Sequence, residues 1–202
     1  MNVREIGCGA GGILEFFKQK GHQVRGYDLG TEYINYGKST HQLELFEGTL
    51  TKVNSSFKPD LIIYSHVLEH ILDLNSEVEL LKKISSKHTL LYIEVPGIKN
   101  IRNSYQANVL RYFQNAHVFH FSLESLTNLM ENFGFLRLCG DQYIRSCFRL
   151  GDRHGERVND FQSVRRFLRS TERLRHLYRF NVASLRCGCY GCSSTADDFS
   201  KN

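Results

Sequence analysis

The sequence predicts an α/β fold, a doubly wound, Rossmann-like and mostly parallel sheet with helices on both faces. Three observations predict it. Short apolar runs, typical of buried parallel strands, alternate over residues 1–150 with segments whose apolar residues recur at helical spacing. The first run leads into a glycine-rich turn, and the second ends in Asp28. Both features are typical of the edge of such a sheet that binds ligands.

The glycine-rich turn reads Glu-Ile-Gly-Cys-Gly-Ala-Gly-Gly from Glu5 to Gly12, directly after the first predicted strand. Gly7, Gly9 and Gly11 alternate, so the backbone can turn sharply and approach a ligand where a Cβ atom would collide. The same turn fits the G-x-G-x-x-G pattern of dinucleotide-binding folds. A merely flexible glycine loop is the structural alternative.

The later elements follow the order of a doubly wound fold. We expect helices over 13–20, 33–38, 78–84 and 122–133, and parallel strands over 24–29, 43–50, 59–64 and 89–95. Residues 135–138 and 143–150 predict a closing antiparallel pair of strands. The segment 98–120 is less regular and rich in aromatic, asparagine and histidine residues. It is therefore a candidate substrate lid over the carboxyl edge.

Asp28 ends the second predicted strand and follows Gly7 by 21 residues. An α/β nucleotide site places a carboxylate there to accept hydrogen bonds from the hydroxyls of a ribose. The structural alternative is a carboxylate that caps the following helix.

The fourth strand is followed at once by Ser-His-Val-Leu-Glu-His, residues 65–70. Ligands in open α/β sheets sit outside the carboxyl ends of the strands, so this topology places His66, Glu69 and His70 near the same site. For His70, a helix-start histidine bonded to the backbone is the structural alternative to a catalytic role.

Composition describes a globular chain. It has 202 residues, 41% of them hydrophobic, and only two prolines, which predicts one domain with a tail. No run approaches the roughly 20 apolar residues of a membrane span, and no signal-peptide pattern opens the sequence, so we expect a cytoplasmic protein without an integral membrane segment. Residues 1–150 carry 16 basic and 15 acidic side chains. That balance argues against nucleic acid as the main partner.

Beyond the domain, residues 151–186 predict a basic amphipathic helical extension, because apolar residues keep one helical face among eight arginines between 153 and 179. A role at a membrane surface or on an acidic polymer is an alternative. Residues 187–202 predict a disordered, cysteine-containing tail. Cys187, Cys189 and Cys192 would suit zinc with a fourth ligand from His176 or a partner chain, but a lone cluster is weak support and we assign no metal site.

These motifs together resemble class I S-adenosylmethionine-dependent methyltransferases of the small-molecule type called methyltransferase domain 23. The resemblance covers residues 3 to about 150. Four motifs carry it in order and at the right spacing: the glycine-rich turn, Asp28, the segment 60–70 and the segment 92–97. The segment 115–121, Asn-Ala-His-Val-Phe-His-Phe, is also similar to the family.

The resemblance implies a seven-stranded sheet, S-adenosylmethionine as cofactor, and methyl transfer to a small-molecule or sugar-type acceptor. It also implies the cofactor contacts. The methionine portion would be held by Glu5 and the backbone of Gly7, Cys8, Gly9 and Gly11, and the ribose by Asp28, with Leu29 also in the cofactor site. Thr49 and Leu50 would flank the adenine, and Ser65 and His66 would face the methionine and the methyl group.

If the acceptor is a hydroxyl, a base must remove its proton, and histidine has a suitable pKa. His117 and His120 are the candidates, with satisfied structural histidines as the alternative. Methylation of oxygen, nitrogen or carbon and the oligomeric state are left open by the sequence.

The sequence departs from the family at two points. Family members often have an acidic residue that binds the adenine amine, and Gly48 to Leu50 contain none. They usually also carry helices before the first strand that close over the cofactor, whereas Met1 stands two residues from that strand, so we expect impaired cofactor binding. The rival predictions are a non-catalytic cofactor-binding module and a nicotinamide-dependent oxidoreductase. An oxidoreductase of this kind would not explain the presence of the Ser-His-Val-Leu-Glu-His segment.

Overall fold

The computed structural model describes residues 1–53, 56–114, 116–151 and 156–186, with side chains as far as residue 175. Its centre is one seven-stranded sheet in the order β3-β2-β1-β4-β5-β7-β6. The strands are β1 (Asn2–Ile6), β2 (Gln23–Asp28), β3 (Leu45–Glu47), β4 (Leu61–Ser65), β5 (Leu90–Glu94), β6 (Phe135–Gly140) and β7 (Arg145–Leu150). Neighbouring strands are parallel except at β7, which is antiparallel to β5 and to β6. The predicted doubly wound, mostly parallel sheet is confirmed.

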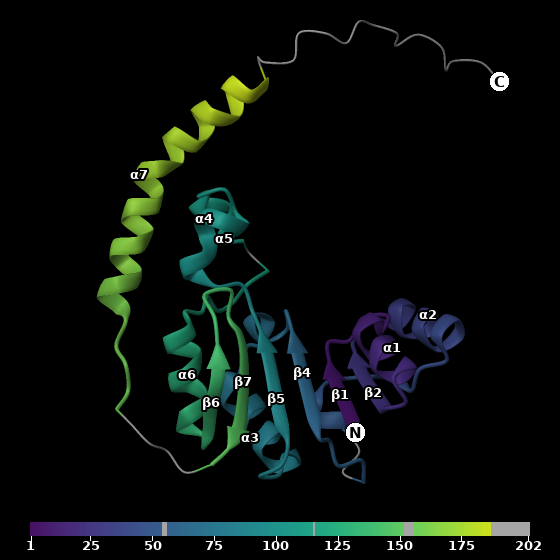
Figure 1. Cartoon of the computed structure of the whole chain (residues 1–202). Helices are drawn as coiled ribbons and strands as arrows, with labels where there is room; N and C mark the ends of the chain where they lie inside the picture. Colours follow the sequence, from purple (N-terminus) through teal and green to yellow (C-terminus); the bar gives the residue numbers. More distant parts are fainter. Residues whose placement is uncertain (54–55, 115, 152–155, 187–202) are drawn as a thin grey trace, which may run out of the picture.

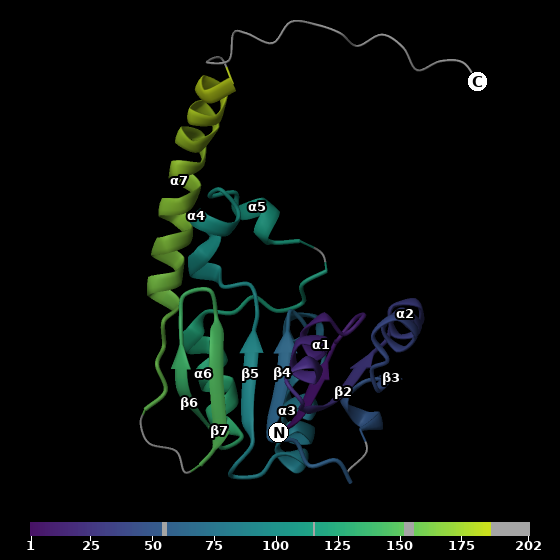
Figure 2. The ribbon, with the colours of Figure 1, turned by 45° about the vertical axis from the view of Figure 1, so that its right-hand side comes forward.

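Helices cover both faces of the sheet. The main ones are α1 (Gly12–Gln19), α2 (Thr31–His41), α3 (Leu74–Ile84) and α6 (Leu123–Asn132). Leu14 of α1 and Ile34 of α2 share one apolar core with Val3 of β1. Val78 of α3 and Leu126 of α6 belong to a second core on the opposite face. Figure 2 shows α3 and α6 together behind the strands.

The ends of α6 follow the chemistry predicted for them. Ser122 caps its start, because the Ser122 hydroxyl accepts a hydrogen bond from the Ser125 amide at 3.0 Å and the Ser125 hydroxyl accepts one from the Ser122 amide at 2.9 Å. Gly134 follows its end with a φ of +86°, the left-handed conformation that favours glycine.

The third strand is shorter than the sequence predicts. We expected a strand over 43–50, but β3 covers Leu45–Glu47, and Leu50 opens a short 3-10 helix, η1 (Leu50–Lys52). The reason is Gly48, whose φ of +145° turns the chain out of the strand while its amide donates to the Asp28 carbonyl at 2.8 Å. The turn brings residues 48–49 back toward the end of β2.

The irregular segment after β5 lies over the carboxyl ends of the parallel strands, where Figure 1 shows α4 and α5 above the strand tips. It contains η3 (Ile98–Asn100), α4 (Ile101–Ser104) and α5 (Val109–Tyr112), and η2 (Leu68–His70) follows β4 at the same edge. Ile98, Ile101 and Tyr112 pack against residues of the C-terminal helix α7 (Phe161–Arg186).

The predicted C-terminal helix is present as α7 (Phe161–Arg186). Among the described residues, no helix has both the length and the apolar character needed to cross a bilayer. The tail predicted over 187–202, with its three cysteines, lies outside the described residues, as does the side chain of His176.

Candidate active site

A cavity of about 560 Å³ opens at the carboxyl ends of β1, β2 and β4. Five of its lining residues are among those predicted to bind the cofactor: Gly7, Asp28, Leu29, Thr49 and His66. They come from four separate stretches of the chain, and parallel strands with a shared carboxyl edge bring such stretches together. The cavity therefore lies where the fold class places its ligand.

Asp28 ties the glycine turn to the end of β2. Its Oδ2 accepts a hydrogen bond from the Gly9 amide at 2.8 Å, and its Oδ1 accepts one from the Gly30 amide at 2.7 Å. Gly30 is the residue before α2, so this bond fixes the approach to the helix and is not a capping bond to an amide of its first turn. Each carboxylate oxygen has a second lone pair, and Asp28 is half-buried at the cavity wall, so it retains acceptor capacity for a ligand hydroxyl.

The glycine turn is shaped by three positive φ angles, +69° at Gly7, +52° at Gly9 and +83° at Gly11. A Cβ atom at Gly7 would lie 2.2 Å from Cγ2 of Val67, and one at Gly11 would lie 2.5 Å from Cδ1 of Leu43. A Cβ atom at Gly9 would meet no protein atom within 4 Å. The open space beside the Gly9 backbone fits a ligand that approaches the main chain closely.

Glu5 is buried beneath this turn with 3% of its surface exposed, and its Oε2 has no hydrogen-bond partner. Burial raises the pKa of Glu5 to about 8, and the nearby charge of Asp28 contributes. A buried carboxylate without a partner is stabilised by a cation. The residues therefore fit S-adenosylmethionine, whose amino-acid end carries an ammonium group.

The raised pKa makes a testable prediction for the cofactor-free chain. Because the folded pKa of about 8 lies above the ordinary value of 4.5, the folded state binds more protons in that window, and the free energy of unfolding falls as pH rises through it. Glu5→Gln has no titratable group at this position, so its melting temperature should rise relative to that of the unmodified chain between pH 5 and pH 8. The corresponding change in the difference of the two free energies of unfolding is about a few kcal/mol, on the order of the pKa shift. Thermal unfolding at both pH values checks it. A difference that does not change with pH would contradict it.

The other six predicted cofactor residues do not line the cavity; besides Glu5 and Gly9, described above, they are Cys8, Gly11, Leu50 and Ser65. Cys8 is buried among the apolar side chains of α1 and α2, and burial raises the pKa of its thiol to about 12, so only its backbone faces the turn. The side chain of Leu50 is 3% exposed and belongs to the core beside α3. Gly11 is closed in by Leu43, and Ser65 is half-buried at the end of β4.

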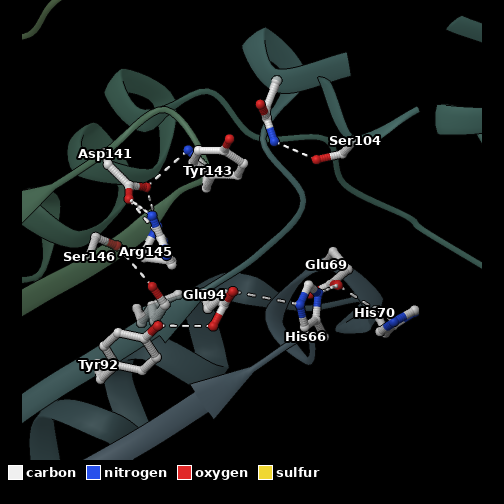
Figure 3. A network of polar contacts seen from close by, with 12 residues as sticks. His66, Glu69, His70, Tyr92, Glu94, Ser104, Asp141, Tyr143, Arg145 and Ser146 are labelled. Carbon is white, nitrogen blue, oxygen red and sulfur yellow. Dashed lines mark hydrogen bonds and ion pairs between the residues drawn. The ribbon is translucent and has the colours of Figure 1, made fainter. Parts of the chain in front are cut away.

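His66 and the segment after it form a polar network, shown in Figure 3. The His66 ring reaches two carboxylates: Nδ1 lies 3.6 Å from Oε1 of Glu69, and Nε2 lies 3.9 Å from Oε1 of Glu94. The contact with Glu69 raises the pKa of His66. The Glu94 carboxylate also accepts a hydrogen bond from the Tyr92 hydroxyl at 2.9 Å. The predicted methyl-facing end of the cavity is thus bordered by ionisable groups.

The two predicted catalytic histidines lie beyond this network, with ring centroids 6.0 Å apart. His117 packs against the ring of His70 at 5.0 Å. His120 packs between Tyr112 and Phe113 and lines a second cavity of about 420 Å³ toward α6 and α7. Burial lowers the pKa of both histidines, which favours the neutral form that can accept a proton. Neither histidine lines the cavity beside Asp28.

The cavity wall also contains residues that were not predicted as site residues from the sequence: Ile6, Gly48, Val67, Ile71, Leu72 and Glu77. Leu72 is a large apolar residue that is 81% exposed. Such a side chain at the cavity wall can pack against a flat ring of a ligand. Glu77 accepts a hydrogen bond from the buried Tyr64 hydroxyl at 2.6 Å. The sequence pattern of α3 does not indicate a place for Glu77 at the cavity wall, because a glutamate in an amphipathic helix normally faces solvent.

The fold and the site define a class of protein. The sheet has the order of a class I methyltransferase, with β7 antiparallel, and differs from the six-stranded order 3-2-1-4-5-6 of dinucleotide-binding folds. The glycine turn meets the carboxylate at the end of β2 beside the cavity. These features are those of an S-adenosylmethionine-dependent methyltransferase.

Comparison with known proteins names the family. The family model of the methyltransferase domain (methyltransferase type 23) matches residues 1–137, and the chain belongs to this family. It is therefore a methyltransferase of the S-adenosylmethionine-dependent type, and S-adenosylmethionine is its cofactor. No curated protein matches the chain.

Solved structures share the fold at low sequence identity. The PH0226 protein of Pyrococcus horikoshii OT3 is 14% identical with a TM-score of 0.58, over 74% of this chain and 82% of that one. A methyltransferase of Methanosarcina mazei is 16% identical with a TM-score of 0.58, over 75% and 93%. Magnesium protoporphyrin IX methyltransferase of Synechocystis PCC 6803, solved with bound S-adenosylhomocysteine, is 15% identical with a TM-score of 0.58, over 72% and 71%.

Proposed function

We propose that this methyltransferase acts on a small-molecule or sugar-type acceptor, with the cofactor in the cavity beside Asp28. The observation that carries the proposal is the meeting of Gly7, Asp28, Leu29 and Thr49 around one cavity whose far end is bordered by His66. The near-neutral charge of residues 1–150 supports a small acceptor over nucleic acid.

Each wall of the cavity has a proposed task. The amino-acid end of the cofactor lies along the open backbone at Gly9, with its ammonium toward Glu5. The free lone pairs of Asp28 accept hydrogen bonds from the ribose hydroxyls. The exposed side chain of Leu29 and the backbone at Thr49 flank the adenine, and Leu50 supports this end from the core.

S-adenosylmethionine supplies a methyl group that is already activated for in-line transfer. The protein therefore has to align the acceptor atom within about 3 to 3.5 Å and, where the acceptor is a hydroxyl, to remove its proton. His66 lies at the methyl-facing end. His117 and His120 are the proposed proton acceptors, and the neutral form that burial favours is the form a base needs.

The acceptor class is tested with cofactor that carries a radiolabelled methyl group. The purified chain is incubated with a cell extract divided into small-molecule, protein and nucleic-acid fractions, and Asp28→Ala provides the background. We expect label in the small-molecule fraction. Label only in protein or nucleic acid would contradict the proposal, and cofactor binding without any transfer would favour a non-catalytic module.

The same assay tests His120. We expect His120→Ala to lower turnover by about 10² to 10⁴-fold, the range for a lost general base, with little change in the KM for the cofactor. His88→Ala is the matched control, because His88 is an exposed histidine before β5 and away from the cavity. An equal loss in turnover and in affinity would make His120 a positioning residue instead.

A further inference from the structure

Glu69, His70 and His117 form a cluster of possible metal ligands beside the cofactor cavity. Each offers one donor atom, and these atoms all lie within 4.8 Å of one another. Two of the residues belong to η2, and the third lies in the loop between α5 and α6. The cluster also borders the cavity, because His70 is part of its lining.

The carboxylate of Glu69 is buried beside two imidazoles but makes no hydrogen bond. The residue is 1% exposed, and neither side-chain oxygen has a hydrogen-bond partner. Its nearest ionisable neighbours are His66, with Nδ1 at 3.6 Å, and His70, with Nε2 at 3.8 Å, both seen in Figure 3. A buried carboxylate in this state is stabilised by a cation between it and the histidines.

The histidine nitrogens are arranged as in a ligand set. Nδ1 of His70 lies 2.6 Å from the Ala116 carbonyl, so it donates its proton there and leaves Nε2 toward Glu69. A histidine that binds a metal commonly holds its other nitrogen in this way. Nε2 of His117 lies 3.1 Å from the Gln114 side-chain amide, and its Nδ1 is buried without a hydrogen-bond partner. With the Gln114 amide turned so that its oxygen accepts from Nε2–H, Nδ1 carries no proton and can bind a metal. Each ring therefore has one nitrogen that is not used by a protein hydrogen bond.

The backbone holds the two segments together. The amides of Val118 and Phe119 both donate to the carbonyl of Glu69, at 2.9 and 3.1 Å. Donor atoms around a tetrahedral zinc ion are about 3.4 Å apart, given metal–ligand distances near 2.1 Å. The three donors lie within 4.8 Å of one another, so they need to approach by about 1.4 Å at most, and of the two histidines His70 is exposed and His117 half-buried.

We propose that Glu69, His70 and His117 bind one divalent first-row transition metal ion, with zinc as the preferred ion. Two imidazoles and one carboxylate suit zinc, iron, cobalt or nickel, whereas magnesium and calcium prefer oxygen ligands throughout. Three protein ligands leave a coordination position open, as in catalytic rather than structural zinc sites. From the sequence alone we assign no metal site, and this proposal adds one.

The position of the site suggests what the open coordination position takes. His66 and His70 border the methyl-facing end of the cavity, so the ion would bind an oxygen atom of the acceptor there. This role rests on the proposed function, whereas binding of the ion does not. The assignment makes His117 a metal ligand and leaves His120 as the proton acceptor.

The test is a calorimetric titration of the full chain with zinc chloride. It uses a parent that carries Cys187→Ser, Cys189→Ser and Cys192→Ser, because those thiols would bind zinc by themselves. We expect one zinc ion per chain with micromolar or tighter affinity. His70→Ala and His117→Ala should each weaken binding at least tenfold. His88→Ala, which replaces an exposed histidine outside the cluster, should bind as the parent does.

A second measurement keeps the proposal falsifiable if a variant fails to fold. Cobalt titrated into the same parent should give the visible absorption of a tetrahedral ion with nitrogen and oxygen ligands, and zinc should displace it. Absence of zinc binding and of the cobalt spectrum in the parent would overturn the site, as would equal zinc binding by folded His70→Ala and the parent. Titration with S-adenosylhomocysteine is read separately, so a failure of cofactor binding is distinguished from a failure of metal binding.

Discussion

Asp28→Ala should weaken binding of S-adenosylhomocysteine by about 10- to 150-fold, equivalent to about 1.5 to 3 kcal/mol, the range for hydrogen bonds to a charged group. Two losses add up in this variant. The ribose hydroxyls lose their acceptor, and the Gly9 amide loses the carboxylate oxygen that holds it at 2.8 Å. Calorimetric titration of the variant and the unmodified chain measures the change.

A charge-matched control separates these effects from a general loss of negative charge. Glu32→Ala removes an exposed carboxylate from the first turn of α2, close in sequence but outside the cavity lining. We expect its dissociation constant to equal that of the unmodified chain. An unchanged dissociation constant in Asp28→Ala would contradict the assignment of Asp28 to the cofactor site.

Gly7→Ala should lower the free energy of unfolding by roughly 2 to 5 kcal/mol. A φ of +69° costs about 1 to 2 kcal/mol for any residue with a Cβ atom. The new methyl group would also lie 2.2 Å from Val67 Cγ2, and overpacking of this kind costs about 1 to 3 kcal/mol. The backbone has little freedom to move away, because the Gly7 amide donates to the Tyr27 carbonyl at 2.7 Å. Urea unfolding measures the loss.

Two other glycines of the same turn serve as controls for Gly7→Ala. Gly9→Ala meets no atom within 4 Å but keeps a φ of +52°, so only the backbone cost remains. Gly12→Ala also meets no atom and begins α1, so it should be neutral or stabilise the chain by up to about 1 kcal/mol. Equal losses in all three variants would contradict this account of the turn.

The sequence predicted those parts of the molecule that periodicity and topology determine. The alternation of apolar runs with helical patterns predicted the sheet, and parallel strands put the residues after each strand at one edge. Gly7 and Asp28 are 21 residues apart, yet their meeting at the cavity required only that β1 and β2 be neighbours.

Other parts depend on packing that the sequence pattern does not contain. Leu50 was predicted beside adenine, but one turn at Gly48 directs its side chain into the core. His117 and His120 are three residues apart, and the fold directs one toward His70 and the other toward Tyr112 and a second cavity. Glu69 gave no sign that its carboxylate is buried, because burial arises from the segment 116–119 that packs over η2.

The central claim is that the cavity at Asp28 binds S-adenosylmethionine. Calorimetric titration of the unmodified chain with S-adenosylhomocysteine, and separately with a nicotinamide dinucleotide, tests it most directly. We predict binding of S-adenosylhomocysteine alone, with micromolar affinity, and its loss in Asp28→Ala. Binding of the dinucleotide instead, or of neither ligand, would contradict the account.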